Sequence, residues 1–154
     1  EEVMSILVII SCGQKKAWDK FPFRGPLRAD CAYTGIPFCV NRRYACEFGD
    51  KRIILSAKYG YIPSDFIISE NYNVSFKNKE SKPISVKELI EQIKEQKLTD
   101  FDKIIGLGGK DYREAIKNSF GEFNKIVEFP FAGLAIGRCM SAVKKALQEK
   151  GGYW

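Results

Sequence analysis

The sequence predicts an α/β fold of three layers, in which a mainly parallel sheet of four to five strands is flanked by helices. Four short, mostly β-branched runs end in small or turn residues, as strands buried on both faces do. Helical patterns lie between and after these runs, and such alternation implies right-handed crossovers between parallel strands. With 154 residues and 45% hydrophobic content, the chain fits one domain over residues 4–154. Residues 1–3 precede Met4 and carry no functional weight.

The predicted elements follow in chain order. A first strand at residues 6–10 is followed by a helix from Pro37, which suits a first turn, to Phe48, before Gly49. A second strand covers residues 52–55. Residues 61–82 fit neither template, but their alternation near Tyr72 indicates an edge strand or hairpin in a long excursion of the kind that often covers sites.

The second half of the chain repeats the strand and helix pattern. Ser85 and Glu88 have the spacing of a capping box in front of an apolar helical face. Strands are then expected at residues 103–105 and 125–129, and helices at residues 111–120 and 138–150. No repeat or linker interrupts this order.

Composition excludes several classes of function. The chain has no histidine, so Ser-His-Asp, Cys-His and HExxH chemistry are all absent. Five cysteines without CxxC spacing favour a reducing, cytoplasmic setting over disulfides, and no metal or cofactor is expected. No apolar run is long enough for a membrane span, so neither a span nor a signal peptide is expected. The net charge of +6 favours anionic partners such as nucleotides or nucleic acid, although solubility alone would also explain it.

The carboxyl ends of the predicted parallel strands are expected to form one site. In open parallel sheets, ligands bind in the crevice outside those ends, so the four following loops should converge. The candidate residues in these loops are Ser11, Cys12, Gly13, Lys15, Lys16, Ser56, Lys58, Tyr59, Gly108, Gly109, Gly133, Gly137 and Arg138. Gly108 and Gly109 open a helix and would let an anion approach backbone N–H groups, and Arg138 offers a planar donor fork. Glycine turns that serve only packing are the alternative, and neither loop matches GxGxxG or the Walker P-loop.

Several side chains in these loops allow two interpretations. Cys12 is either a low-pKa nucleophile near Lys15 and Lys16 or a small buried side chain. Lys58 and Tyr59 either hold a substrate oxygen or phosphate, or pack together as a lysine stem over a ring.

Several carboxylates lie near the loops, and the sequence does not show which of them would act as a catalytic base. Asp30, Asp65, Glu70, Asp111 and Glu114 are the nearest carboxylates in sequence. Arg42 and Arg43 either contact a nucleic-acid backbone or form an ordinary exposed helical face.

Several short motifs occur along the chain: SCGxKK at residues 11–16, YxG at 33–35, paired arginines at 42–43, LSAKYG at 55–60, Tyr72, the glycine pair at 108–109 and PxAGLxIGR at 130–138. Through these motifs the chain resembles a family of small, largely uncharacterised bacterial, archaeal and phage proteins. Asn73 follows Tyr72 where aspartate is expected. Through these motifs the resemblance adds Tyr33, Arg43 and Tyr72 to the substrate- or anion-binding residues. The family is distantly similar to the peroxide-stress protein YaaA, which implies a nucleotide or nucleic-acid substrate.

Three functions are therefore expected, in order of preference. The first is an enzyme that acts on a nucleotide or a nucleic-acid base, at an N-glycosidic or a phosphate bond, with Ser56, Lys58 and Tyr59 orienting or activating the substrate. The second is a non-catalytic nucleic-acid-binding module linked to stress or base modification, in which the basic residues follow phosphates. The third is a thiol redox sensor that uses Cys12. The sequence does not determine the oligomeric state.

Overall fold

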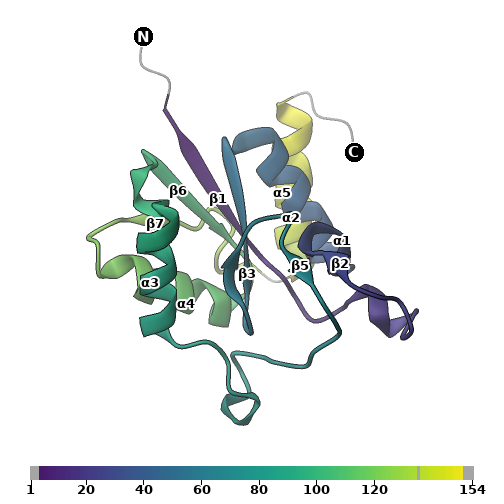
Figure 1. Ribbon diagram of the computed structural model, residues 1–154. Helices are drawn as coiled ribbons and strands as arrows, with labels where there is room; N and C mark the ends of the chain where they lie inside the picture. Colours follow the sequence, from purple (N-terminus) through teal and green to yellow (C-terminus); the bar gives the residue numbers. More distant parts are fainter. Residues whose placement is uncertain (1–3, 135, 151–154) are drawn as a thin grey trace.

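The structure, a computed structural model, describes residues 4–134 and 136–150 and contains a five-stranded sheet (Figure 1). The strand order is β4-β3-β1-β6-β7. The central strand β1 (Ile6–Ser11) pairs in parallel with β3 (Lys51–Ser56) and with β6 (Lys103–Leu107), and β6 pairs in parallel with β7 (Val127–Glu128). The edge strand β4 (Gly60–Ile62) is antiparallel to β3. The four predicted strands and their parallel pairing are confirmed, and β4 is an addition.

Helices cover both faces of this sheet, as the three-layer prediction requires (Figure 1). One face carries α2 (Ile36–Phe48) and α5 (Ile136–Glu149), and the other carries α3 (Val86–Gln96) and α4 (Lys110–Gly121). The shorter elements are η1 (Ala17–Asp19), β2 (Leu27–Arg28), α1 (Ala29–Ala32), β5 (Ile67–Ile68), η2 (Lys79–Ser81) and η3 (Leu98–Asp100). β2 and β5 form a separate antiparallel pair.

The strands are buried on both faces because their alternate side chains enter two cores. In β1, Val8 and Ile10 pack with the α2 and α5 side, whereas Leu7 and Ile9 pack with the α3 and α4 side, and all four are at most 1% exposed. This two-sided burial explains why the strands read as continuous apolar runs instead of alternating ones.

The helix ends lie close to the positions that the sequence predicts. The Ser85 side chain accepts a hydrogen bond of 3.1 Å from the Glu88 backbone N–H and so caps α3. The backbone N–H of Gly49 donates to the carbonyl oxygen of Ala45 at 2.9 Å where α2 ends.

The edge strand expected near Tyr72 does not form, and the hairpin alternative is reduced to one antiparallel bridge across a turn. Residues 69–85 contain only a single bridge between Ser75 and Asn78, followed by η2. Ser81 determines this conformation, because its hydroxyl group accepts from the Ser75 N–H and donates to the Ser75 carbonyl oxygen, at 3.0 and 3.1 Å. The alternating pattern was misleading because these local bonds to side chains replace strand pairing.

Within residues 4–134 and 136–150, no helix combines the length and the apolar character that crossing a membrane requires.

Candidate functional site

A cavity of about 680 Å³ opens at the carboxyl ends of β1 and β6. These neighbouring strands are followed by helices on opposite faces of the sheet, α2 after β1 and α4 after β6, which leaves a crevice between the two loops. The lining residues are Ser11, Cys12, Gly13, Gln14, Lys15, Gly35, Ile36, Pro37, Phe38, Asn41, Ser75, Phe76, Lys77, Gly108, Gly109, Lys110, Asp111, Tyr112, Gly137 and Met140. Its volume lies in the range that small-molecule ligands occupy.

Helix N-termini surround the cavity. The first residues of α2 and α4 line it, and Gly137 from the first turn of α5 lines it as well. The residues that precede α2 and α4 are Gly35 and Gly109, so no side chain caps either helix. Backbone N–H groups without partners and the positive ends of the helix dipoles therefore favour an anion here.

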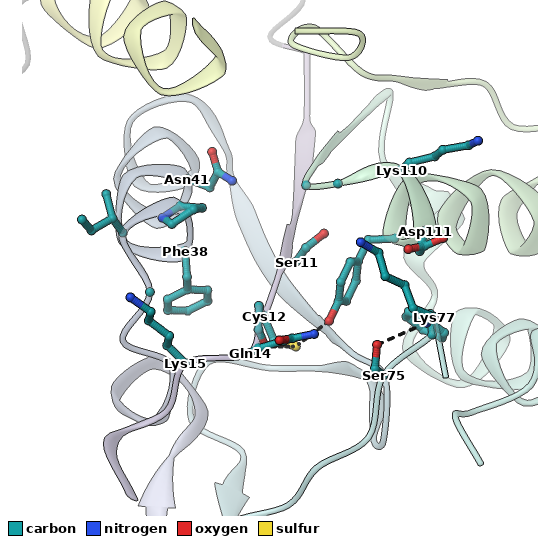
Figure 2. A pocket seen from close by; sticks show the side chains of 18 of the residues that line it. Ser11, Cys12, Gln14, Lys15, Phe38, Asn41, Ser75, Lys77, Lys110 and Asp111 are labelled. Atoms are coloured by element: carbon teal, nitrogen blue, oxygen red, sulfur yellow. Dashed lines mark hydrogen bonds between the residues drawn. The ribbon is translucent and has the colours of Figure 1, made fainter. Parts of the chain in front are cut away.

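The charged side chains of the cavity reinforce this preference. Lys15, Lys77 and Lys110 are exposed at its rim, whereas Asp111 is the sole carboxylate among the described residues that line it. Figure 2 shows Lys15 beside α2 and the two other lysines across the cavity with Asp111. Of the five carboxylates that the sequence leaves open, the structure brings Asp111 to the cavity.

The remaining walls are largely apolar and aromatic. Phe38 and Met140 line the side of α2 and α5, and Phe76 and Tyr112 line the opposite side with their rings edge to face at 5.2 Å. Asn41 adds a polar group beside Phe38, as Figure 2 shows; it is only 4% exposed, and its Oδ1 has no hydrogen-bond partner. An anion site next to aromatic walls and a buried amide suits a planar ligand that carries a negative charge.

Ser11 fixes the loop that follows β6. Its hydroxyl group donates to the carbonyl oxygen of Leu107 at 2.8 Å. Gly108 has a φ angle of +147°, and a Cβ atom there would lie 1.8 Å from the Ser11 Oγ atom. Glycine is therefore required at position 108, and Ser11 holds the loop before α4 in place.

Cys12 lies at the wall of the cavity as a buried side chain. It is 2% exposed, and its sulfur atom is 3.3 Å from the Tyr112 hydroxyl group. Burial raises the pKa of the Cys12 thiol above its ordinary value, although Tyr112 and the nearby Lys16 act in the opposite direction. Burial also raises the pKa of Tyr112. The structure thus confirms that Cys12 is a buried side chain, and its burial disfavours the thiolate that a low-pKa nucleophile requires.

A second polar cluster, which we call the tyrosine cluster, comprises Ser56, Tyr33, Tyr59, Tyr72, Lys16 and Lys58. The Tyr72 hydroxyl group is 2.9 Å from the Ser56 Oγ and 2.5 Å from the Tyr33 hydroxyl group. Lys16 and Lys58 place their Nζ atoms 4.5 and 5.4 Å from the centre of the Tyr72 ring. Burial raises the pKa of Tyr33 and Tyr72 and lowers the pKa of Lys16.

The cavity and the tyrosine cluster divide the predicted site residues between them. Ser11, Cys12, Gly13, Lys15, Gly108, Gly109 and Gly137 line the cavity. Ser56 ends β3, and Lys58 and Tyr59 follow it. These three residues do not line the cavity, because β3 lies on the far side of β1 from β6. The Ser56 hydroxyl group accepts hydrogen bonds from the backbone N–H groups of Lys58 and Tyr59 at 3.2 and 3.1 Å. The Lys58 Nζ atom lies 5.2 Å from the Tyr59 ring centre.

Three predicted residues lie outside both groups. Gly133 and Arg138 are exposed and do not line the cavity. Arg43 borders a separate hollow on the outer side of α2, together with Asp30 and Arg42.

Sequence reasoning did not identify Phe38, Asn41, Phe76, Lys77 and Lys110 as site residues. Phe38 and Asn41 belong to the first turns of α2, so the glycine and proline before them were the available signal. Phe76 and Lys77 come from the long excursion. Its length indicated that it covers a site, but nothing in its sequence indicated which of its residues line that site. Among the described residues, no group of three or more Cys, Asp or Glu side chains is placed to hold a metal ion.

Comparison with known proteins gives a family for the chain. The model of DUF6884, a family of unknown function, matches residues 7–145. The chain is 37% identical over 148 residues to the uncharacterized protein YfjM of Bacillus subtilis (strain 168). This alignment covers 96% of this chain and 98% of that protein. No solved structure matches the chain significantly. Both the match over most of its length and the full-length relative show that the chain belongs to the DUF6884 family of unknown function.

Proposed function

We propose that this protein is an enzyme that binds a nucleotide unit in the cavity and acts on its N-glycosidic or phosphate bond. The observation that carries the proposal is the uncapped N-terminus of α4, flanked by Lys110 and Lys77, which opens into a cavity with aromatic walls. The phosphate accepts hydrogen bonds from the first N–H groups of α4. The base packs against the aromatic walls, where Asn41 offers its amide.

Asp111 serves as the general base in this proposal. It lies in the first turn of α4, next to the anion site, and it is the carboxylate that the described lining residues supply. In a hydrolysis, Asp111 accepts a proton from water while the water oxygen forms a bond to the sugar carbon or to phosphorus. The bond to the leaving group breaks with its electron pair, and the leaving group takes up the proton.

The tyrosine cluster has a conditional part in the proposal. Ser56, Lys58 and Tyr59 orient or activate the substrate only if it extends beyond the cavity, because they do not line it. Lys58 is exposed, so its ammonium group is accessible to a longer ligand.

The test combines binding with product analysis. Wild type and Asp111→Asn are titrated with the four ribonucleoside monophosphates by calorimetry, and products are analysed by chromatography for free base and inorganic phosphate. We expect one monophosphate to bind and to be converted by wild type only. Asp111→Asn should bind it as tightly or more tightly, because a negative charge beside the anion is removed. Absence of binding by every monophosphate, or equal turnover by the variant, would refute the proposal; Asp65→Asn, at an exposed position, is the matched control.

The alternative is a non-catalytic nucleic-acid-binding module of the cytoplasm. The three exposed lysines at the rim, compared with one carboxylate, favour this alternative, because lysine side chains can bind the phosphates of a nucleic acid without any catalytic group. The distant similarity of the family to the peroxide-stress protein YaaA, which shares a serine, a Tyr-Gly turn and a downstream tyrosine, is consistent with this alternative as well. Salt-sensitive binding of oligonucleotides without any product would favour the module over the enzyme.

A further inference from the structure

Two phenylalanine side chains project into solvent on a turn close to the cavity. Phe21 is 62% exposed and Phe23 is fully exposed, and they flank Pro22 between Lys20 and Arg24. Single exposed apolar residues are ordinary, but two aromatic rings on one turn between two cations are a feature of interaction sites. In Figure 1, η1 and this turn extend away from the body of the molecule beyond β2.

The turn is held in a defined conformation. The Arg24 backbone N–H donates to the Phe21 carbonyl oxygen at 3.0 Å, and proline suits the position between them. The buried Trp18, which is 3% exposed, supports the turn, because its indole N–H donates to the Arg24 carbonyl oxygen at 2.8 Å. The rings are therefore presented by an ordered segment, which lowers the entropy that binding would cost.

A basic groove borders this turn at Phe21 and Arg24 and borders the cavity at Lys15. The groove has a volume of about 570 Å³, and Lys15 lines both the groove and the cavity. Lys20 and Arg24 also line the groove with exposed side chains, against Asp19 as its carboxylate. Lys16 borders the groove as well, but it is buried and its ammonium group lies over the Tyr72 ring. One oxygen of that carboxylate already accepts the Lys16 backbone N–H at 2.9 Å. The surface from the cavity to the turn is thus positively charged, with aromatic rings at its far end.

We infer that the ligand is a single strand of nucleic acid, whose terminal or exposed nucleotide enters the cavity while its neighbours follow the groove and stack on Phe21 and Phe23. This inference rests on the proposed function and names its substrate class. Aromatic rings that stack bases beside cations that contact phosphates are the two components of single-strand binding sites. An anionic membrane would also attract this turn. The single strand is favoured because the basic groove leads inward to an anion cavity, a path that a membrane surface does not use.

The experiment measures fluorescence anisotropy of labelled single strands of about 12 nucleotides, of DNA and of RNA, with wild type and the double variant Phe21→Ala/Phe23→Ala. We expect the double variant to bind the strand at least about tenfold more weakly, because each stacked base contributes substantially to affinity. Its affinity for the monophosphate that fills the cavity should be unchanged. Ile126→Ala, which removes a side chain that is 86% exposed elsewhere, is the matched control and should bind as wild type does.

The remaining outcomes separate this inference from the proposed function. If the double variant keeps full affinity for the strand while the monophosphate still binds the cavity, the inference is overturned and the proposed function stands. If vesicles of phosphatidylcholine and phosphatidylserine bind wild type but not the double variant, and strands bind neither, the turn is a membrane contact and the inference is again overturned. If neither strand nor monophosphate binds wild type, both proposals fail.

Discussion

Replacing Gly109 with aspartate should stabilise the protein while abolishing anion binding. Gly109 precedes α4 with φ −73° and ψ 174°, an extended conformation in which aspartate is a preferred helix cap, and an added Cβ atom meets nothing within 4 Å. The new carboxylate would accept the N–H groups that we assign to the phosphate. Stability and binding should therefore change in opposite directions, which a general disruption of the fold cannot produce.

The magnitudes follow from the helix end. A cap in place of glycine contributes a few tenths of a kcal/mol, and a negative charge at a helix N-terminus adds about 0.3–1 kcal/mol. Together they amount to about 1 kcal/mol, or a rise of about 2–4 °C in Tm for a chain of this size. A second negative charge about 4 Å away repels the phosphate by up to about 4 kcal/mol, so affinity should fall by up to about a thousandfold.

Two assays measure the two effects. Calorimetric titration with inorganic phosphate and with the monophosphates reports affinity, and thermal unfolding without ligand reports Tm. Gly121→Asp, at the exposed opposite end of α4 with open space around its Cβ position, places the same charge where the helix dipole disfavours it. That control should keep full affinity and gain no stability. Unchanged affinity in Gly109→Asp, or a lower Tm, would refute the assignment of the anion to α4.

Further predictions concern the buried polar groups. Ser119→Ala should lower the free energy of unfolding in urea by about 1–3 kcal/mol, because the buried Tyr61 hydroxyl loses its partner at 2.7 Å. Tyr61→Phe should cost less, since Ser119 keeps its bond to a backbone carbonyl, and the reverse order would contradict this. The free energy of unfolding should also fall as pH rises above about 9, because burial raises the pKa of Cys12 and Tyr112, and both then ionise more readily in the unfolded chain. Constant stability from about pH 8 to about pH 10.5 in urea titrations would exclude this. Mass-spectrometric mapping after iodoacetamide treatment near neutral pH should find exposed Cys39 alkylated and Cys12 intact; equally rapid labelling of Cys12 would argue against its burial.

Local pattern was sufficient for most of the fold. The apolar runs at residues 6–10, 52–55 and 103–105 predicted strands buried on both faces, and the structure pairs them in parallel. Ser85, Pro37 and Gly49 marked helix ends because caps and turns depend on a few neighbouring residues. The same local logic failed at residues 72–76, where hydrogen bonds from Ser81 replace strand pairing.

The composition of the site depended on information that no local pattern contains. The amino-acid sequence is enough to show that polar and glycine-rich loops follow the strands, and that histidine chemistry is absent. Which of these loops share a cavity depends on the assembled sheet, because β1 lies between β3 and β6 and so separates Ser56 and Lys58 from Gly108 and Gly109. The tertiary structure also brought Asn41 and Asp111, on helices that cover opposite faces of the sheet, to one crevice. Strand order results from long-range packing, so residues distant in sequence become neighbours only when the sheet assembles.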